Sequence, residues 1–231
     1  MLWGLSDRDW AALWLSFKLA AATSAILTVV ATPLAWWLTR SRARAVVLLE
    51  AVVALPLVLP PTVLGFYLLV LLGPHGALGR ALAALGIGPL PFSFGGILLG
   101  SLVYSLPFAV QPLHAAFSAV GTRLLEVSAT LRAPPLATFF HVVVPLARRG
   151  FVSAAALSFA HTLGEFGVVL MLGGSIPRQT ETASIAIFRQ VEAMELDAAH
   201  RLAAILALLC FVILLATYAM NRRKLQLDLG A

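Results

Sequence analysis

Five long, mainly apolar runs constrain this chain of 231 residues more than any other feature. A helix rises about 1.5 Å per residue, so about 20 residues cross a bilayer core of about 30 Å. Each run is long enough to do so: 11–38, 46–72, 92–120, 151–172 and 202–220. We therefore expect an all-α polytopic membrane protein, with about five transmembrane helices in a single domain of residues 1–231.

The composition excludes several other classes of protein. Hydrophobic residues make up 61% of the chain and charged residues 11%, whereas an average soluble domain has about 25% charged residues. The net charge of +6 is scattered among apolar blocks and forms no patch for a nucleic acid. The one cysteine, Cys210, forms neither an intrachain disulfide nor a multi-cysteine metal site. A soluble enzyme, a disordered tail and a nucleic-acid binder are excluded.

The positive charges predict how the spans are oriented, because cytoplasmic loops collect Lys and Arg. One side of the bundle holds the first and third connections and the C-terminal tail, with Arg40, Arg42, Arg44, Arg123, Arg132, Arg148, Arg149, Arg222, Arg223 and Lys224. The other side has fewer, namely Arg8, Arg80, Arg178, Arg189 and Arg201. We predict an external N-terminus, a cytoplasmic C-terminus, and outward loops at 73–91 and 175–200. Residues 184–191 either form part of that outer loop or dip into the membrane as a re-entrant piece.

The second run contains three prolines, Pro56, Pro60 and Pro61, followed by Thr62 and Gly65. Each proline removes a backbone donor and costs about 3 kcal/mol in an ordinary helix. Such breaks survive in a bilayer only where other helices or a water-lined cavity satisfy the freed carbonyls. The segment is either a structural kink or a kink that lines a passage, and the candidate pathway residues are Pro60, Pro61, Thr62 and Gly65.

The fourth run carries Ser158, His161, Thr162 and Glu165. A spacing of four places His161 and Glu165 on one face of a helix. Ionisable groups at membrane depth are costly and usually face the bundle interior or a cavity. We take these four residues as further pathway candidates; the alternative is a polar pair that locks two helices together. One His and one Glu are too few ligands for a metal site.

The pattern of residues 121–149, on the predicted cytoplasmic side, predicts two short helices. The first is followed by a break at Pro134-Pro135 and the second by a stop at Pro145. In the first helix the apolar residues form a patch and the charged ones lie at its edge: Leu124, Leu125, Ala129 and Leu131, with Glu126 and Arg132. A helix pair lying flat on the membrane surface predicts a docking element for a soluble partner.

This stretch resembles a known motif. Glu126-Val-Ser-Ala-Thr-Leu131, followed by Pro145-Leu-Ala, is similar to the EAA loop of ABC-transporter permease subunits. The resemblance implies that the loop fits a groove on a cytoplasmic ATPase and transmits its closure, with Glu126, Ala129, Leu131, Arg132 and Pro145 as the coupling residues. Arg132 stands where glycine is usual. It must adopt a left-handed conformation at about 1 kcal/mol, or the helix must end differently.

Three further runs resemble the molybdate branch of this permease family: residues 55–69, 105–112 and 159–167. Sulfate, thiosulfate and tungstate permeases share parts of the pattern. The resemblance implies a permease subunit of an ATP-driven, binding-protein-dependent importer of molybdate or tungstate in the inner membrane. Two copies of the chain would form the pathway, two ATPase subunits would bind the coupling loops, and an extracytoplasmic oxyanion-binding protein would dock outside.

The chain itself has no phosphate loop, because no Gly-x-x-x-x-Gly-Lys-Ser/Thr occurs. We expect ATP and Mg²⁺ on the partner, no cofactor on this chain and no covalent catalysis. No Arg lies in the middle of a span, which predicts a weak, transient site in the passage. Two alternatives remain, a permease for another oxyanion such as sulfate and a proton-coupled secondary transporter using His161 and Glu165. No internal repeat supports the second.

Overall fold

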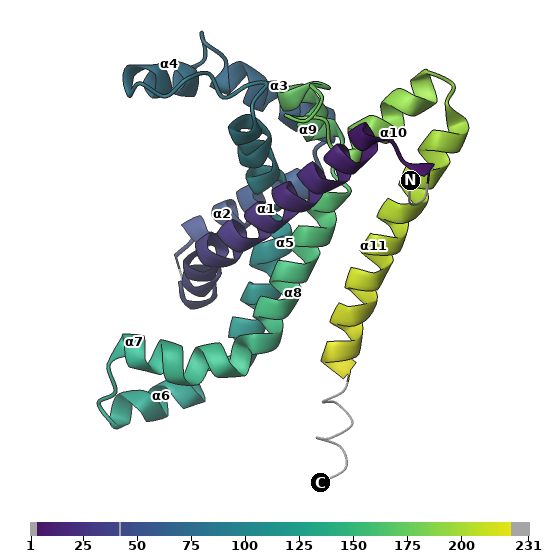
Figure 1. The fold of residues 1–231 in the computed structure, drawn as a ribbon. Coiled ribbons are helices and arrows are strands. Elements are labelled where there is room, and N and C mark those ends of the chain that lie inside the picture. The colour runs from purple at the N-terminus through teal and green to yellow at the C-terminus, as the bar shows by residue number, and fades with distance from the viewer. Residues whose placement is uncertain (1–3, 42, 223–231) are drawn as a thin grey trace.

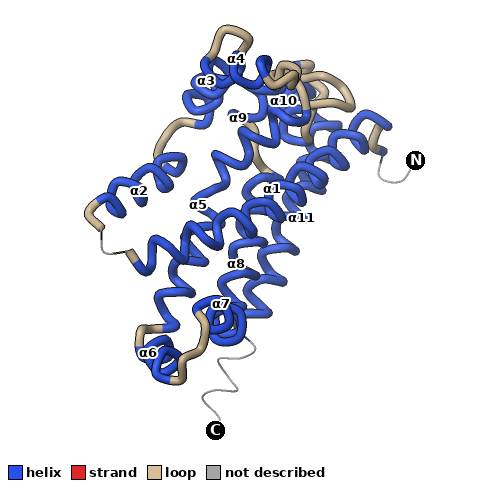
Figure 2. The backbone as a smooth tube through the Cα atoms, turned by 90° about the vertical axis from the view of Figure 1, so that its left-hand side faces the viewer, coloured by secondary structure: helices blue, strands red, loops and turns tan. Residues whose placement is uncertain are grey.

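The computed structural model describes residues 4–41 and 43–222, and within them every regular element is helical (Figures 1 and 2). Arg42, Arg223 and Lys224, which entered the orientation prediction, lie outside the described residues. The elements, in chain order, are α1 (Asp7–Arg40), α2 (Ala45–Ala54), a 3₁₀ turn (Leu55–Leu57), α3 (Pro61–Leu72), α4 (Ala77–Ala84), α5 (Phe94–Val120), α6 (Arg123–Thr130), α7 (Pro135–Thr138), a π-helical turn (Phe139–Val143), α8 (Val144–Leu163), α9 (Gly167–Gly173), α10 (Ala183–Glu192) and α11 (Leu196–Arg222).

The all-α polytopic prediction is confirmed. Four helices of the described residues are long and apolar enough to cross a membrane, namely α1, α5, the continuous helix Pro135–Leu163 and α11. The fifth run, 46–72, is not one helix. Its two halves, Ala45–Leu57 and Pro61–Leu72, meet at an angle of 110°. The bend falls at Pro60 and Pro61, whose rings block a continuous helical ladder.

The fourth run, 151–172, is also divided. Helix α8 ends at Leu163, Gly164 caps it, and α9 starts only at Gly167. Glycines on both sides of the break are poor helix formers, which favours a turn here. The prediction that His161 and Glu165 share a helix face is therefore wrong, because Glu165 lies beyond the end of α8.

Helices α1, α5 and α8 pack together as the centre of the molecule. Where α8 meets α5, a Cβ added to Gly150 would overlap the Ala116 side chain and lie 3.1 Å from the Pro112 carbonyl oxygen. Small residues let backbones approach this closely in membrane bundles. Helix α11 packs on α8 and α10 and leaves most of its surface exposed.

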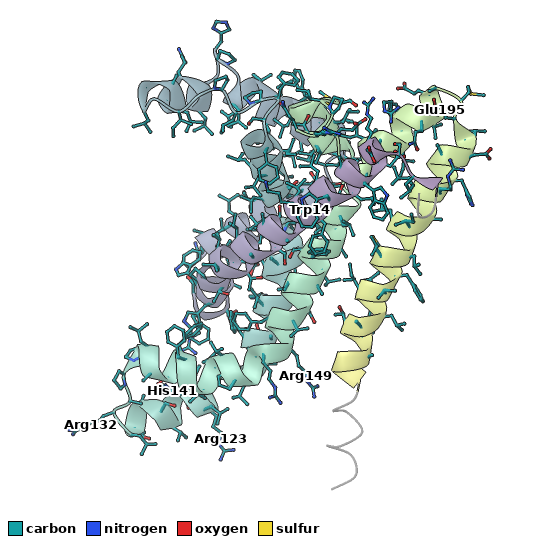
Figure 3. The ribbon with its side chains drawn as sticks, viewed as in Figure 1. Trp14, Arg123, Arg132, His141, Arg149 and Glu195 are labelled. Carbon is teal, nitrogen blue, oxygen red and sulfur yellow. The ribbon has the colours of Figure 1, made fainter. Side chains whose placement is uncertain are left out.

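The two ends of the molecule carry different elements. Helices α6 and α7 lie at the same end as the C-terminal end of α11, whereas α4, α10 and the start of α1 lie at the other end (Figure 1). Arg123, Arg132 and Arg149 gather at the α6–α7 end, and Glu195 lies at the opposite one (Figure 3). The predicted outer loop 73–91 contains α4, and residues 184–191 lie within α10.

Candidate functional site

A cavity of about 400 Å³ lies where α3 begins, α8 ends and α5 passes between them. Its walls come from three of the predicted spans, at positions near the middle of each. The lining residues are Pro61, Thr62, Tyr104, His161, Gly164, Glu165, Phe166 and Gly167. Four predicted pathway residues thus meet in one place: Pro61, Thr62, His161 and Glu165.

The two helix breaks create this cavity. Pro61 is the first residue of α3, a position where its missing N–H removes nothing from the helix. Gly167, the first residue of α9, packs so closely on α3 that an added Cβ would lie 2.7 Å from the Pro61 Cβ. The start of α3 is therefore held against the break after α8. The N–H groups of Val63 and Leu64 donate to the Pro60 carbonyl, and Thr62, the first residue of α3 with an N–H, lines the cavity.

His161 is held by α5. Its Nδ1 lies 2.9 Å from the Ser105 hydroxyl, which also lies 2.8 Å from the Thr162 hydroxyl. The imidazole stacks on the Phe108 ring at a centroid distance of 3.9 Å and lies 4.8 Å from the Tyr104 ring. One stacked ring, one tilted ring and one hydrogen bond fix both the plane and the rotation of the imidazole.

Glu165 is almost completely buried, with 4% of its surface exposed. Neither of its carboxyl oxygens makes a hydrogen bond of ordinary geometry among the described residues. The buried Ser101 hydroxyl of α5 interacts with this carboxyl group but also lacks such a bond. Buried polar groups are nearly always hydrogen-bonded, so each exception needs a specific explanation. Glu165 is therefore the most unusual side chain in the cavity wall.

The remaining pathway candidates lie outside the lining. Pro60 precedes α3 at its N-cap, and Gly65 packs on α9, where an added Cβ would lie 2.8 Å from the Met171 Cβ. Ser158 is buried and donates to the Ala154 carbonyl at 2.7 Å, within its own helix. Thr162 is outside the lining as well, and the Ser105 hydroxyl links it to the lining residue His161.

Sequence reasoning missed the contribution of α5. Tyr104, Ser105 and Phe108 contact His161, yet they were not among the candidates. Their signal was the spacing of Tyr104, Phe108 and Gln111, which places all three on one face of α5. A second cavity of about 290 Å³, also missed, lies beside α5 and α2 and contains Glu50, Gln111 and His114.

The predicted docking element has an exposed apolar face. Leu124, Val127 and Leu131 of the first short helix and Leu136 and Phe140 of the second are 44–77% exposed. Leu125, from the predicted patch, instead packs against the core. The coupling candidates Glu126, Ala129, Leu131, Arg132 and Pro145 are exposed as well.

Arg132 adopts the left-handed conformation, with φ of 56°. The sequence allowed either a left-handed Arg132 or a different end of the helix, and the chain adopts the left-handed conformation. A non-glycine residue there costs about 1 kcal/mol. The chain thus keeps the turn that a glycine would make freely.

The predicted stop at Pro145 is wrong. A single helix runs from Pro135 to Leu163, through α7, the π-helical turn and α8. The Val144 N–H bonds the Phe139 carbonyl, five residues back, so the ladder changes register just before the proline. Phe139 packs between Trp36 of α1 and Phe117 of α5 at centroid distances of 5.2 and 6.0 Å. The second half of the predicted docking element is therefore continuous with α8, which carries His161 in its last turn and ends at Leu163 beside the cavity.

A buried ion cluster stabilises the opposite end. Glu181 is 1% exposed and accepts hydrogen bonds from Arg8 at 2.7 and 2.8 Å and from Arg189 at 2.9 Å. Beside it, Gln190 donates to Asp9 at 2.7 Å. These contacts join the start of α1 to α10. Among the described residues no three His, Cys, Asp or Glu side chains gather as a metal site.

Residues 17–226 match the model of the binding-protein-dependent transport system inner membrane component family. The chain is 58% identical over 224 residues to the molybdenum transport system permease protein ModB of Azotobacter vinelandii, covering 97% of this chain and 99% of that one. Among less similar relatives, the sulfate transport system permease protein CysT of Salmonella typhimurium is 31% identical over 232 residues, covering 95% and 83%.

A solved structure has the same fold. It is that of a bacterial ABC transporter involved in the import of the acidic polysaccharide alginate, with a TM-score of 0.74 at 15% identity over 94% of this chain and 80% of that one.

Proposed function

We propose, from the premise that this chain belongs to the family of binding-protein-dependent transport system inner membrane components, that it is the permease subunit of an ATP-driven molybdate importer. The observation that carries the proposal is the 58% identity to a molybdenum permease over nearly the full length of both chains. The chain moves its substrate without covalent chemistry, and ATP and Mg²⁺ bind to a partner.

The exposed apolar face of α6 and α7 supports a cytoplasmic ATPase as that partner. Apolar side chains such as Leu131, 77% exposed, and Leu136, 73% exposed, are costly in water and mark protein interaction sites when they cluster. Two copies of the chain with two ATPases make the assembly. The N-terminus is external, the C-terminus is cytoplasmic, and a binding protein docks near α4 and α10.

The continuous helix from Pro135 to Leu163 supports a direct route for coupling. Closure of the ATPases moves α6 and α7, and a helix without a stop carries that movement to the residues at its far end. There it ends beside His161 and Glu165, in the cavity wall. The cavity belongs to the passage, which alternates between inward and outward openings.

Sulfate is the second candidate substrate. A sulfate permease is 31% identical to this chain over 95% of its length, and both substrates are tetrahedral dianions. Tungstate has nearly the same size and charge as molybdate. Membership of the family supports a transporter driven by a partner over the proton-coupled alternative.

Uptake by reconstituted vesicles tests the proposal. The chain is incorporated with its ATPase, and the cognate binding protein and labelled molybdate are added outside. We expect uptake that needs both ATP and the binding protein. Excess tungstate should inhibit this uptake more strongly than excess sulfate does. Uptake of sulfate in preference to molybdate would favour the second candidate. Uptake without ATP would contradict the assignment to this class of transporter.

A further inference from the structure

The cavity between α3, α5 and the end of α8 contains hydrogen-bond donors but no cation. Its lining includes Thr62, Tyr104, His161 and Glu165, and no Lys or Arg. We propose that the cavity receives the oxyanion through uncharged hydrogen-bond donors, and that Glu165 takes part as a carboxylic acid that donates a hydrogen bond to an oxyanion oxygen. This inference rests on the proposed function, because it concerns the recognition of the same substrate.

The start of α3 provides the first donors. Thr62 is the first residue of α3 that carries a backbone N–H, since Pro61 has none. The N–H groups of Val63 and Leu64 donate to the Pro60 carbonyl, which leaves the Thr62 N–H as the free backbone donor at the start of α3. A free N–H at a helix start attracts anions together with the helix dipole. The Thr62 hydroxyl lies at the same place. A twelve-residue helix therefore directs its positive end at the cavity.

Glu165 provides a second, independent observation. Its carboxyl group is buried in the cavity wall, and neither oxygen makes a hydrogen bond of ordinary geometry within the described part of the chain. A carboxylate here would repel an approaching dianion. A carboxylic acid has an O–H that can donate to it. Only the protonated form is therefore compatible with an oxyanion in this cavity.

The hydrogen bond between Ser105 and His161 sets which ring nitrogen of His161 carries the proton. The Ser105 hydroxyl lies between the Thr162 hydroxyl at 2.8 Å and His161 Nδ1 at 2.9 Å. When Thr162 donates to Ser105 and Ser105 donates to Nδ1, the imidazole carries its proton on Nε2. The ring then offers an N–H donor. Ser105 is a positioning residue, and Phe108 holds the ring plane by stacking.

Uncharged donors suit a transport site better than cations. Hydrogen bonds from neutral groups to an anion are weaker than those from Arg, which also forms bidentate pairs with oxyanions. A passage must release its substrate when the cavity changes shape. The donor set described above recognises a tetrahedral oxyanion by the directions of its oxygens and holds it only briefly.

The first experiment compares two replacements of Glu165 in the complete complex, reconstituted in vesicles with ATPase and binding protein. Labelled molybdate uptake and binding-protein-stimulated ATP hydrolysis are measured together. Glu165→Gln keeps a neutral donor and should keep uptake within about twofold of the unmodified chain. Glu165→Leu removes the donor and should lower uptake about tenfold or more while ATP hydrolysis persists, as expected for loss of one bond to an anion.

Two results would overturn the inference. Uptake by Glu165→Leu at the unmodified rate would mean that the carboxyl makes no contact with the substrate. An equal loss in Glu165→Gln and Glu165→Leu would mean that a negative charge is needed instead of a donor. Failure of the proposed function looks different, because the unmodified complex itself would then transport no molybdate.

A second pair of variants tests the cavity without touching Glu165. Tyr104→Phe removes a hydroxyl from the lining and should lower uptake several-fold with ATP hydrolysis retained. Tyr67→Phe is the matched control, since Tyr67 is 64% exposed on α3 and outside the lining. Ser105→Ala should lower uptake, and Ser105→Thr, which keeps the hydroxyl, should restore it. Equal uptake by Tyr104→Phe and Tyr67→Phe, or no rescue by Ser105→Thr, would contradict the donor set.

Discussion

Glu181 should be the strongest polar contributor to the end of the molecule opposite α6 and α7. Its carboxylate accepts two hydrogen bonds from Arg8, one from Arg189 and one from Ser175. Removing one partner of a buried ion pair costs about 3–5 kcal/mol. The side chains of Arg8 and Arg189 are 39% and 31% exposed, and solvent screening weakens such contacts.

We therefore expect Glu181→Ala to destabilise the folded chain by about 2 kcal/mol, below the range for a fully buried pair. Arg8→Ala should cost about as much, because it leaves the buried carboxylate with fewer donors. The double variant should cost no more than about 1 kcal/mol beyond Glu181→Ala, since the two residues share one interaction. Thermal unfolding in detergent should show a decrease of about 4–8 °C for each single variant.

Arg80→Ala is the matched control, because Arg80 is exposed on α4 and forms no ion pair among the described residues. It should leave the unfolding temperature unchanged. Because the cluster joins α1 to α10, Glu181→Ala should also weaken docking of the binding protein. Additive effects of Arg8→Ala and Glu181→Ala, or effects no larger than that of Arg80→Ala, would refute this reasoning.

Four other outcomes are expected. Glu126→Ala, at the exposed docking element, should weaken co-purification of the ATPase while membrane insertion stays intact; lost insertion would make the residue structural. Arg132→Gly should relieve up to about 1 kcal/mol of strain at its positive φ. Slower hydrogen exchange in α6 would report this gain in stability, and faster exchange would contradict the prediction. Gly150→Ala should lower stability by about 1–3 kcal/mol through overpacking against Ala116, measured by thermal unfolding against Gly164→Ala, whose added Cβ meets nothing closer than 3.9 Å. Titration calorimetry of the isolated chain should detect no sub-micromolar molybdate binding, because the cavity lining has no Lys or Arg.

The positions of the helix breaks explain which predictions succeeded. Four of the five apolar runs overlap a described helix that is long and apolar enough to cross a membrane, because length and hydropathy are local properties. The stop at Pro145 failed because a proline within a helix has more than one outcome. Here a π-helical turn just before Pro145 lets the helix continue through the proline. Phe139, the first residue of that turn, packs against Trp36 and Phe117. No pattern within a few residues of Pro145 predicts contacts with α1 and α5.

The sequence by itself determined the class of molecule: an all-helical membrane chain with an exposed pair of short helices, in a family whose motifs it carries. These features depend on residue composition, spacing and short motifs. Only the tertiary structure decided that Thr62, Tyr104, His161 and Glu165 line one cavity. They come from three runs far apart in the chain, and their meeting depends on a 110° bend and a break after α8. Helix packing, which spacing along the chain does not encode, brings them together.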